Sequence, residues 1–203
     1  MNGEALKLIL ATNNKNKVIE INDLLQSLDI EVLGITEIIK DFDIEETGKT
    51  FKENAYIKAA AAAKASGLYA FGDDSGLQVD ALDGAPGVYS SRYAETDEKR
   101  INKLLKALKD IPQEKRTARF VCAMTLVSSG GKILFECEET CEGIISEKPK
   151  GNQGFGYDPI FYIQQINATM AELPLEEKNK ISHRSKAIKK LIQWLKNNAC
   201  NLK

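Results

Sequence analysis

The amino-acid sequence predicts an α/β fold, because strand-like and helix-like segments alternate from its first residues. The apolar run Leu6–Ala11 is typical of a buried strand. Polar, turn-forming residues interrupt it, and apolar side chains then recur at helical spacing from Val18 to Leu28. A second strand pattern follows at Glu31–Ile35. The order strand, loop, helix, strand indicates an α/β architecture.

The next helix and strands are marked by local signals. Thr50 and Glu53 have the spacing of a capping box, so we expect a helix to begin there, and Gly67 is a good stop for it. The apolar stretches Leu68–Gly72 and Leu77–Leu82 are predicted to be two strands on either side of an acidic turn.

The second half of the chain continues the alternation. Thr96 or Asp97 is expected to cap a helix that runs to about Leu108. The remaining predictions are a hairpin of Ala118–Ser128 and Lys132–Cys141 with a tight primed turn at Gly130-Gly131, a short helix after Pro174, and a last helix capped by Ser182.

Composition limits the function classes. The chain has 203 residues, of which 43% are hydrophobic and 28% charged, which suits one soluble domain, with or without two lobes. The formal net charge of −1 argues against a nucleic-acid-binding protein. No stretch is long enough to cross a bilayer, and the first apolar run is too short for a signal peptide, so we expect a cytoplasmic protein.

Two adjacent carboxylates, Asp73 and Asp74, are the first candidate for chemistry. Like charges side by side repel, and burying even one is unfavourable without a counter-ion. Such a pair suits a hard cation such as Mg²⁺ or a water that must be activated. The alternative is a plain acidic turn, since Asp-Asp-Ser-Gly is also good turn chemistry.

Two polar loops precede predicted helices. The first carries a hydroxyl, three amides and two lysines, which suit a phosphate at a helix N-terminus, or which form an ordinary solvated loop: Thr12, Asn13, Asn14, Lys15, Asn16 and Lys17. The second contains Glu45 and Glu46, which either complement the helix dipole or supply a metal ligand beside Asp73 or Asp74.

Two segments near the C-terminal end suit a nucleotide. In Gly154–Pro159 the glycines allow close backbone approach, and Phe155 either stacks on a planar base or packs into the core. In Glu177–Lys186 cations gather at a helix start, against the helix dipole, and an anionic ligand would remove that conflict. His183 is the only histidine, and with Arg184 it forms a dense set of donors.

Read together, these segments resemble the Ham1/ITPase family of nucleoside-triphosphate pyrophosphatases. The matching stretches, in order, are Leu10–Lys17, Glu45–Gly48, Phe51–Ala55, Asp73–Leu77, Gly84–Tyr93, Gly154–Pro159, Met170–Leu173 and Ser182–Arg184. The likeness runs from about residue 6 to about residue 196. It implies an elongated mixed sheet flanked by helices, with two lobes and a central cleft in one domain of residues 1–203, and a homodimer.

The resemblance also implies an activity and roles. The expected reaction is hydrolysis of non-standard purine nucleotides, namely ITP, XTP and their deoxy forms, to the monophosphate and pyrophosphate. Asp74 would act as the base, and Glu45 and Asp74 would hold Mg²⁺. The substrate would be bound by the residues of the first loop and by Ser75, Phe155, Gly156, Tyr157, Asp158, Lys178, His183 and Arg184.

Three other functions are alternatives to this interpretation of the sequence. A related pyrophosphatase of modified pyrimidine nucleotides, as in the Maf-like proteins, would differ in the nucleotides that release pyrophosphate. A nucleotide-sensing module without turnover fits less well, because carboxylates beside phosphate are unfavourable unless a metal intervenes. A nucleic-acid-binding role is the weakest alternative at this net charge.

Overall fold

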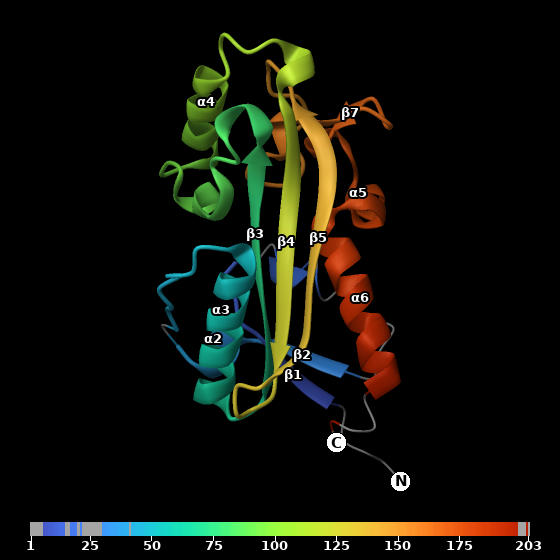
Figure 1. Cartoon of the computed structure of the whole chain (residues 1–203). Coiled ribbons are helices and arrows are strands. Elements are labelled where there is room, and N and C mark those ends of the chain that lie inside the picture. Colours follow the sequence, from blue (N-terminus) through green and yellow to red (C-terminus); the bar gives the residue numbers. More distant parts are fainter. Residues whose placement is uncertain are drawn as a thin grey trace. The chain divides into compact units, whose positions relative to one another are not determined.

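The computed structural model describes residues 6–14, 17–19, 21, 30–40, 42–198 and 202. Its strands form one mixed sheet in the order β2-β1-β3-β4-β5-β6-β7 (Figure 1). The strands are β1 Leu6–Leu10, β2 Ile30–Gly34, β3 Tyr69–Val79, β4 Thr117–Val127, β5 Ile133–Ile145, β6 Phe161–Ile163 and β7 Ala168–Thr169. The helices are α2 Ile35–Ile38, α3 Phe51–Ser66, α4 Asp97–Ala107, α5 Leu175–Ile181 and α6 His183–Asn198. The predicted α/β class is therefore confirmed.

The chain forms two compact units, each with its own core. Unit 1 consists of Met1–Asp74, Cys122–Glu139 and Arg184–Lys203, and unit 2 consists of Ser75–Val121 and Thr140–His183. Among the described residues, no helix is both long enough and apolar enough to span a membrane.

The sheet of unit 1 is buried on both faces. β1 pairs in parallel with β2 and with β3. Since neighbouring strand residues point to opposite faces, Leu8 and Leu10 pack with Ile188 of α6, whereas Ile9 packs with the alanines of α3. Continuous apolar runs such as β1 are typical of strands covered on both sides.

Helix α3 approaches the sheet closely. The predicted capping box is confirmed, because Thr50 accepts the N–H of Glu53 and the Glu53 side chain accepts the N–H of Thr50. Gly67 ends the helix with a left-handed φ of 71°. Opposite the helix, a Cβ on Gly72 would lie 2.5 Å from the carbonyl oxygen of Ala55, so only glycine fits there.

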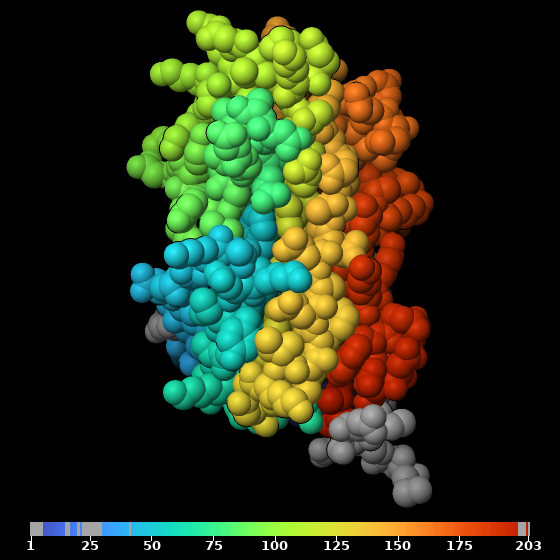
Figure 2. Space-filling view, in the orientation of Figure 1, coloured from blue at the N-terminus to red at the C-terminus, as the bar shows by residue number. Residues whose placement is uncertain are grey.

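Helix α6 covers the other face. It lies beside β5 (Figures 1 and 2), where Lys190 forms an ion pair with Glu139 and the Cys137 thiol donates to the carbonyl of Ala187 at 3.8 Å. The predicted helix between Val18 and Leu28 falls mostly outside the described residues. In this segment, the described residues 17–19 and 21 are helical.

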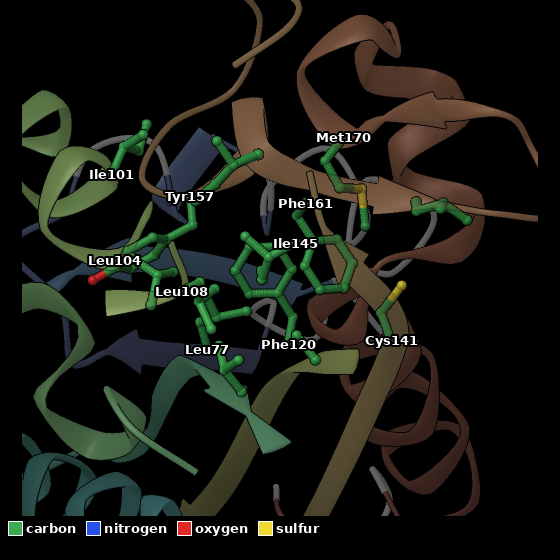
Figure 3. Packing of buried hydrophobic residues seen from close by; sticks show 14 of the residues in the cluster. Leu77, Ile101, Leu104, Leu108, Phe120, Cys141, Ile145, Tyr157, Phe161 and Met170 are labelled. Atoms are coloured by element: carbon green, nitrogen blue, oxygen red, sulfur yellow. The ribbon is translucent and has the colours of Figure 1, made fainter. Parts of the chain in front are cut away.

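The core of unit 2 is a separate apolar cluster. Leu77, Phe120, Ile145 and Phe161 point toward one another, with Leu104 of α4 beside them (Figure 3). The centroids of the Phe120 and Phe161 rings are 4.3 Å apart. β5, β6 and β7 pair antiparallel here, which makes the sheet mixed.

Two sequence predictions about turns are wrong. The acidic segment is not a turn between two strands: residues 69–79 form the single strand β3, and residues 80–82 form a 3₁₀ turn. The hairpin is confirmed, but its turn is not of the primed type. Of the two turn glycines, Gly130 and Gly131, only Gly131 has a positive φ, of 81°. The N–H of Gly131 donates to the carbonyl of Ser128, as in three-residue hairpin loops. Helix α2, which follows β2 directly, was not predicted.

Candidate active site

Polar and charged side chains of unit 1 surround the middle of β3. We call this set the aspartate cluster, and its members are Lys17, Glu46, Asn54, Lys58, Asp73, Asp74 and Arg184. Asp73 and Asp74 are successive strand residues, so their side chains lie on opposite faces of the sheet. This is why a strand can hold both: the two carboxylates do not share one environment.

Asp73 faces the side of the sheet that α6 covers. Its side chain is 0% exposed, and its Oδ2 lies 2.8 Å from Lys17 Nζ and 3.5 Å from Arg184 Nε. Burial by itself would raise the pKa of this carboxyl, but the charges of Lys17, Arg184 and Lys58 outweigh it and hold the pKa below its usual range. Asp73 is therefore an ionised, internally compensated group.

Asp74 faces α3. Asn54 Nδ2 donates to its Oδ2 at 3.1 Å, and Lys58 Nζ donates to its Oδ1 at 3.1 Å. Asn54 and Lys58 are four residues apart on α3, so they stand one above the other on the same helix face. The Asn54 Oδ1 accepts the N–H of Gly48 at 2.8 Å, which orients the amide and ties the acidic loop to the helix.

Lys58 joins the two acidic elements of the cluster. Its Nζ lies 2.7 Å from Glu46 Oε1 as well as 3.1 Å from Asp74 Oδ1, so both carboxylates converge on one positive charge. Burial lowers the pKa of Lys58, but Asp74, Asp73 and Glu46 together outweigh this and raise it. Burial also raises the pKa of Asp74, with a contribution from Glu46, against the lowering effect of Lys58 and Lys17.

The first polar loop is partly described. Thr12 is half-buried and its hydroxyl accepts the N–H of Asn14 at 3.2 Å, while the Asn14 side chain accepts the N–H of Lys17 at 3.4 Å. The exposed Asn13 donates to the carbonyl of Phe42 at 2.8 Å. The loop thus caps the start of a helix. Lys15 and Asn16, which the sequence predicts to bind substrate, lie outside the described residues.

Unit 2 contains a second group, the Phe155 cluster, made of Phe155, Asp158 and Lys178. Asp158 Oδ2 accepts the N–H of Phe155 at 3.0 Å and lies 2.9 Å from Lys178 Nζ. The same ammonium stands over the half-buried Phe155 ring, 4.8 Å from its centroid. A Cβ on Gly154 would lie 2.1 Å from Asp158 Oδ2, so glycine is required for the carboxylate to turn inward.

The other predicted residues of unit 2 are held by their own partners. The N–H of Gly156 donates to Asp97 at 2.7 Å, and the Tyr157 hydroxyl donates to the carbonyl of Ser90 at 3.0 Å. The His183 ring stacks on Phe120 at 4.9 Å. Ser75 follows Asp74 in β3 and is half-buried.

Comparison with known proteins places the chain. A profile of the Ham1 family matches residues 8–194. The chain belongs to the Ham1 family. The dITP/XTP pyrophosphatase of Desulforamulus reducens is 49% identical over 94% of this chain and 96% of its own length. The dITP/XTP pyrophosphatase of Halalkalibacterium halodurans is 50% identical over 92% of this chain and 97% of its own length. A HAM1 protein from Coxiella burnetii has a solved structure with a TM-score of 0.88, 46% identity, and coverage of 95% of this chain and 99% of that one.

The Ham1 match spans both clusters, and the structure adds residues to those predicted. Asn54 and Lys58 were not among the predicted site residues, although Asn54 lies in one of the matching stretches. The available signal was a pair of polar residues one helical turn apart beside buried alanines, because such residues must meet polar partners. Glu46, rather than the exposed Glu45, supplies the carboxylate at Lys58.

Proposed function

We propose that this chain hydrolyses non-standard purine nucleoside triphosphates, namely ITP, XTP and their deoxy forms, to the monophosphate and pyrophosphate. The names of relatives at about half identity over nearly the whole chain support this substrate class. The observation that carries the reaction type is the environment of Asp74: a buried carboxylate with a raised pKa, oriented by an amide and an ammonium. Such a group is suited to take a proton.

Asp74 is assigned the role of base. Two hydrogen bonds from α3 fix the plane of its carboxyl, and it would accept a proton from the water that attacks the α-phosphorus. Thr12, Asn13, Asn14, Lys15, Asn16, Lys17 and Ser75 are assigned to bind and orient the phosphates. Since the protein forms no covalent bond in this scheme, positioning and electrostatic stabilisation supply the catalysis.

The donor set of the aspartate cluster fits Mg²⁺. Mg²⁺ takes one or two protein carboxylates and completes its shell with waters and phosphate oxygens. Glu46 and Asp74 already converge on a single cationic group, Lys58. We therefore assign the ligands to Asp74 and Glu46, and the choice of Glu45 made from the sequence stays a prediction. Glu45→Gln and Glu46→Gln variants, compared for Mg²⁺ affinity, distinguish the two. When bound, the metal would offset charge on the departing pyrophosphate.

Recognition of the purine base of the nucleotide is assigned to the donors at the start of α6 and to the Phe155 cluster. Hypoxanthine and xanthine present an acceptor at position 6, and adenine presents a donor. The donors of His183 and Arg184 therefore match the first two purines, whereas adenine would set a donor against a donor. Phe155 would stack on the base. The Gly156, Tyr157 and Asp158 backbone would line the edge of the purine. Lys178, whose ammonium stands over the Phe155 ring, would help to neutralise the triphosphate.

A homodimer and a cytoplasmic location complete the proposal, with no nucleic-acid or membrane partner. Sedimentation of the purified chain tests the homodimer. The near-neutral formal charge of −1 supports the absence of a nucleic-acid role.

The test of the function is a nucleotide panel. The protein is incubated with ITP, XTP, GTP and ATP, with and without Mg²⁺, and the products are resolved. We expect the monophosphate and pyrophosphate from ITP and XTP, with Mg²⁺ required and ATP used poorly. Release of the diphosphate and orthophosphate, or equal use of ATP and ITP, would contradict the proposal.

A further inference from the structure

Asp73 contacts two cations that come from distant parts of the chain. Lys17 lies in the first helical segment and Arg184 in the first turn of α6, yet both approach the same carboxylate oxygen, at 2.8 Å and 3.5 Å. Lys17 Nζ and Arg184 Nε can therefore be no farther apart than the sum of these two distances. All three side chains are largely buried, with exposures of 13% for Lys17, 4% for Arg184 and 0% for Asp73.

The two aspartates cannot act as one chelating pair. Asp74 is on the α3 face of β3 with Glu46 and Lys58, whereas Asp73 is on the α6 face. The negative charge of Asp73 is moreover already matched by two positive groups. Asp74 and Glu46, in contrast, share one positive group, Lys58, so that side of the strand keeps a net negative charge that a metal can neutralise.

We propose that Asp73 is a positioning residue that links phosphate binding to base recognition by holding Lys17 and Arg184 in one fixed arrangement. The proposal rests on the function proposed above, in which Lys17 binds phosphate and Arg184 reads the base. Two buried cations at this separation repel each other unless an anion lies between them. Without Asp73 both side chains would move, and a displacement of about 1 Å at a site of this kind can lower the rate about 10²-fold.

The first test is Asp73→Asn, which keeps the shape of the side chain and removes its charge. We expect kcat/KM for ITP to fall about 10²-fold. The ITP/ATP ratio of kcat/KM should fall with it, by about tenfold, because Arg184 is no longer held. Asp110→Asn, the same change at an exposed position, is the matched control and should leave both values unchanged.

Binding of Mn²⁺ alone, followed by electron paramagnetic resonance, separates positioning from metal ligation. We expect Asp73→Asn to weaken Mn²⁺ binding much less than Asp74→Asn does. Equal weakening in the two variants would overturn the proposal, because it would make Asp73 a ligand. Circular dichroism checks that each variant is folded.

A second variant keeps the proposal testable if Asp73→Asn does not fold. Lys17→Met removes a residue that is assigned to phosphate alone, so an independent Lys17 would lower the rates with ITP and ATP by the same factor. If Asp73 couples it to Arg184, the ITP/ATP ratio must fall as well, by about tenfold. A proportional loss would overturn the coupling. Failure of the unmodified protein to hydrolyse ITP would instead refute the proposed function.

Discussion

Asn54→Asp tests how closely Asp74 depends on helix α3. The change keeps the size of the side chain but places an oxygen where the amide nitrogen now lies, 3.1 Å from Asp74 Oδ2. With an effective dielectric constant of about 20, two full charges at that distance repel by about 5 kcal/mol. Binding one proton at pH 7 to a carboxyl with an ordinary pKa of about 3.9 costs about 4 kcal/mol. Binding a proton therefore costs less free energy than keeping both carboxyls charged.

The sign of the pH dependence follows from that proton. The two adjacent carboxyls of the variant, at positions 54 and 74, share one proton, which raises the folded-state pKa of the pair above its unfolded value. The variant therefore keeps its stability below about pH 4 and loses it as the pH rises through that folded-state pKa. We expect Asn54→Asp to be destabilised by about 4 kcal/mol at pH 7 but only about 1.5 kcal/mol at pH 5. At pH 5 the protonated carboxyl introduced on α3 would donate to Asp74, as the amide of Asn54 does now.

The assay is urea unfolding of the variant and the unmodified protein at both pH values. Asn102→Asp, the same substitution at an exposed position of α4, is the control and should change the unfolding free energy little at either pH. An equal loss of stability at pH 5 and pH 7 would refute the reasoning, since simple misfit of the side chain carries no pH dependence. A loss no larger than that of the control would show that Asn54 and Asp74 are not coupled.

Three further substitutions have defined outcomes. Asp74→Asn should lower kcat by about 10² to 10⁴ while leaving nucleotide binding largely intact, and a near-normal steady-state rate would refute its role as base. Arg184→Ala should raise the use of ATP relative to ITP, and an unchanged ratio of kcat/KM would show that Arg184 does not read the base. Gly72→Ala forces a Cβ to within 2.5 Å of the Ala55 carbonyl, so it should cost about 1–3 kcal/mol of unfolding free energy, whereas Gly130→Ala, whose Cβ would meet only a side-chain oxygen at 3.8 Å, should be tolerated.

Features that depend on neighbouring residues were predictable from the sequence. The capping box of Thr50 and Glu53 and the stop at Gly67 involve only local hydrogen bonds and backbone freedom, so the limits of α3 could be predicted. The apolar run of β1 likewise indicated a strand covered on both faces.

Features that depend on residues distant in the sequence were not predictable. Asp73 and Asp74 were predicted to lie in a turn because Asp-Asp-Ser-Gly is good turn chemistry. Two carboxylates in a buried strand are unfavourable without counter-charges. Their compensation comes from Lys17 and Arg184 on one face and from α3 on the other, and no local pattern shows those contacts. The same limit explains why Asn54 was missed: its importance lies in bridging Gly48 and Asp74, which only the folded chain brings together.

The register of β3 against β1 has a consequence for folding fidelity. Leu8 is paired with Tyr69, Ile9 with Ala70 and Leu10 with Phe71, and this alignment decides which carboxylate meets which helix. A slip by one residue would turn Asp73 toward the alanines of α3 and Asp74 toward the leucines beneath α6, each stranded without its counter-charge. The two aspartates thus favour the correct register, because a misaligned strand would bury both carboxylates without their counter-charges, which the correctly paired strand avoids.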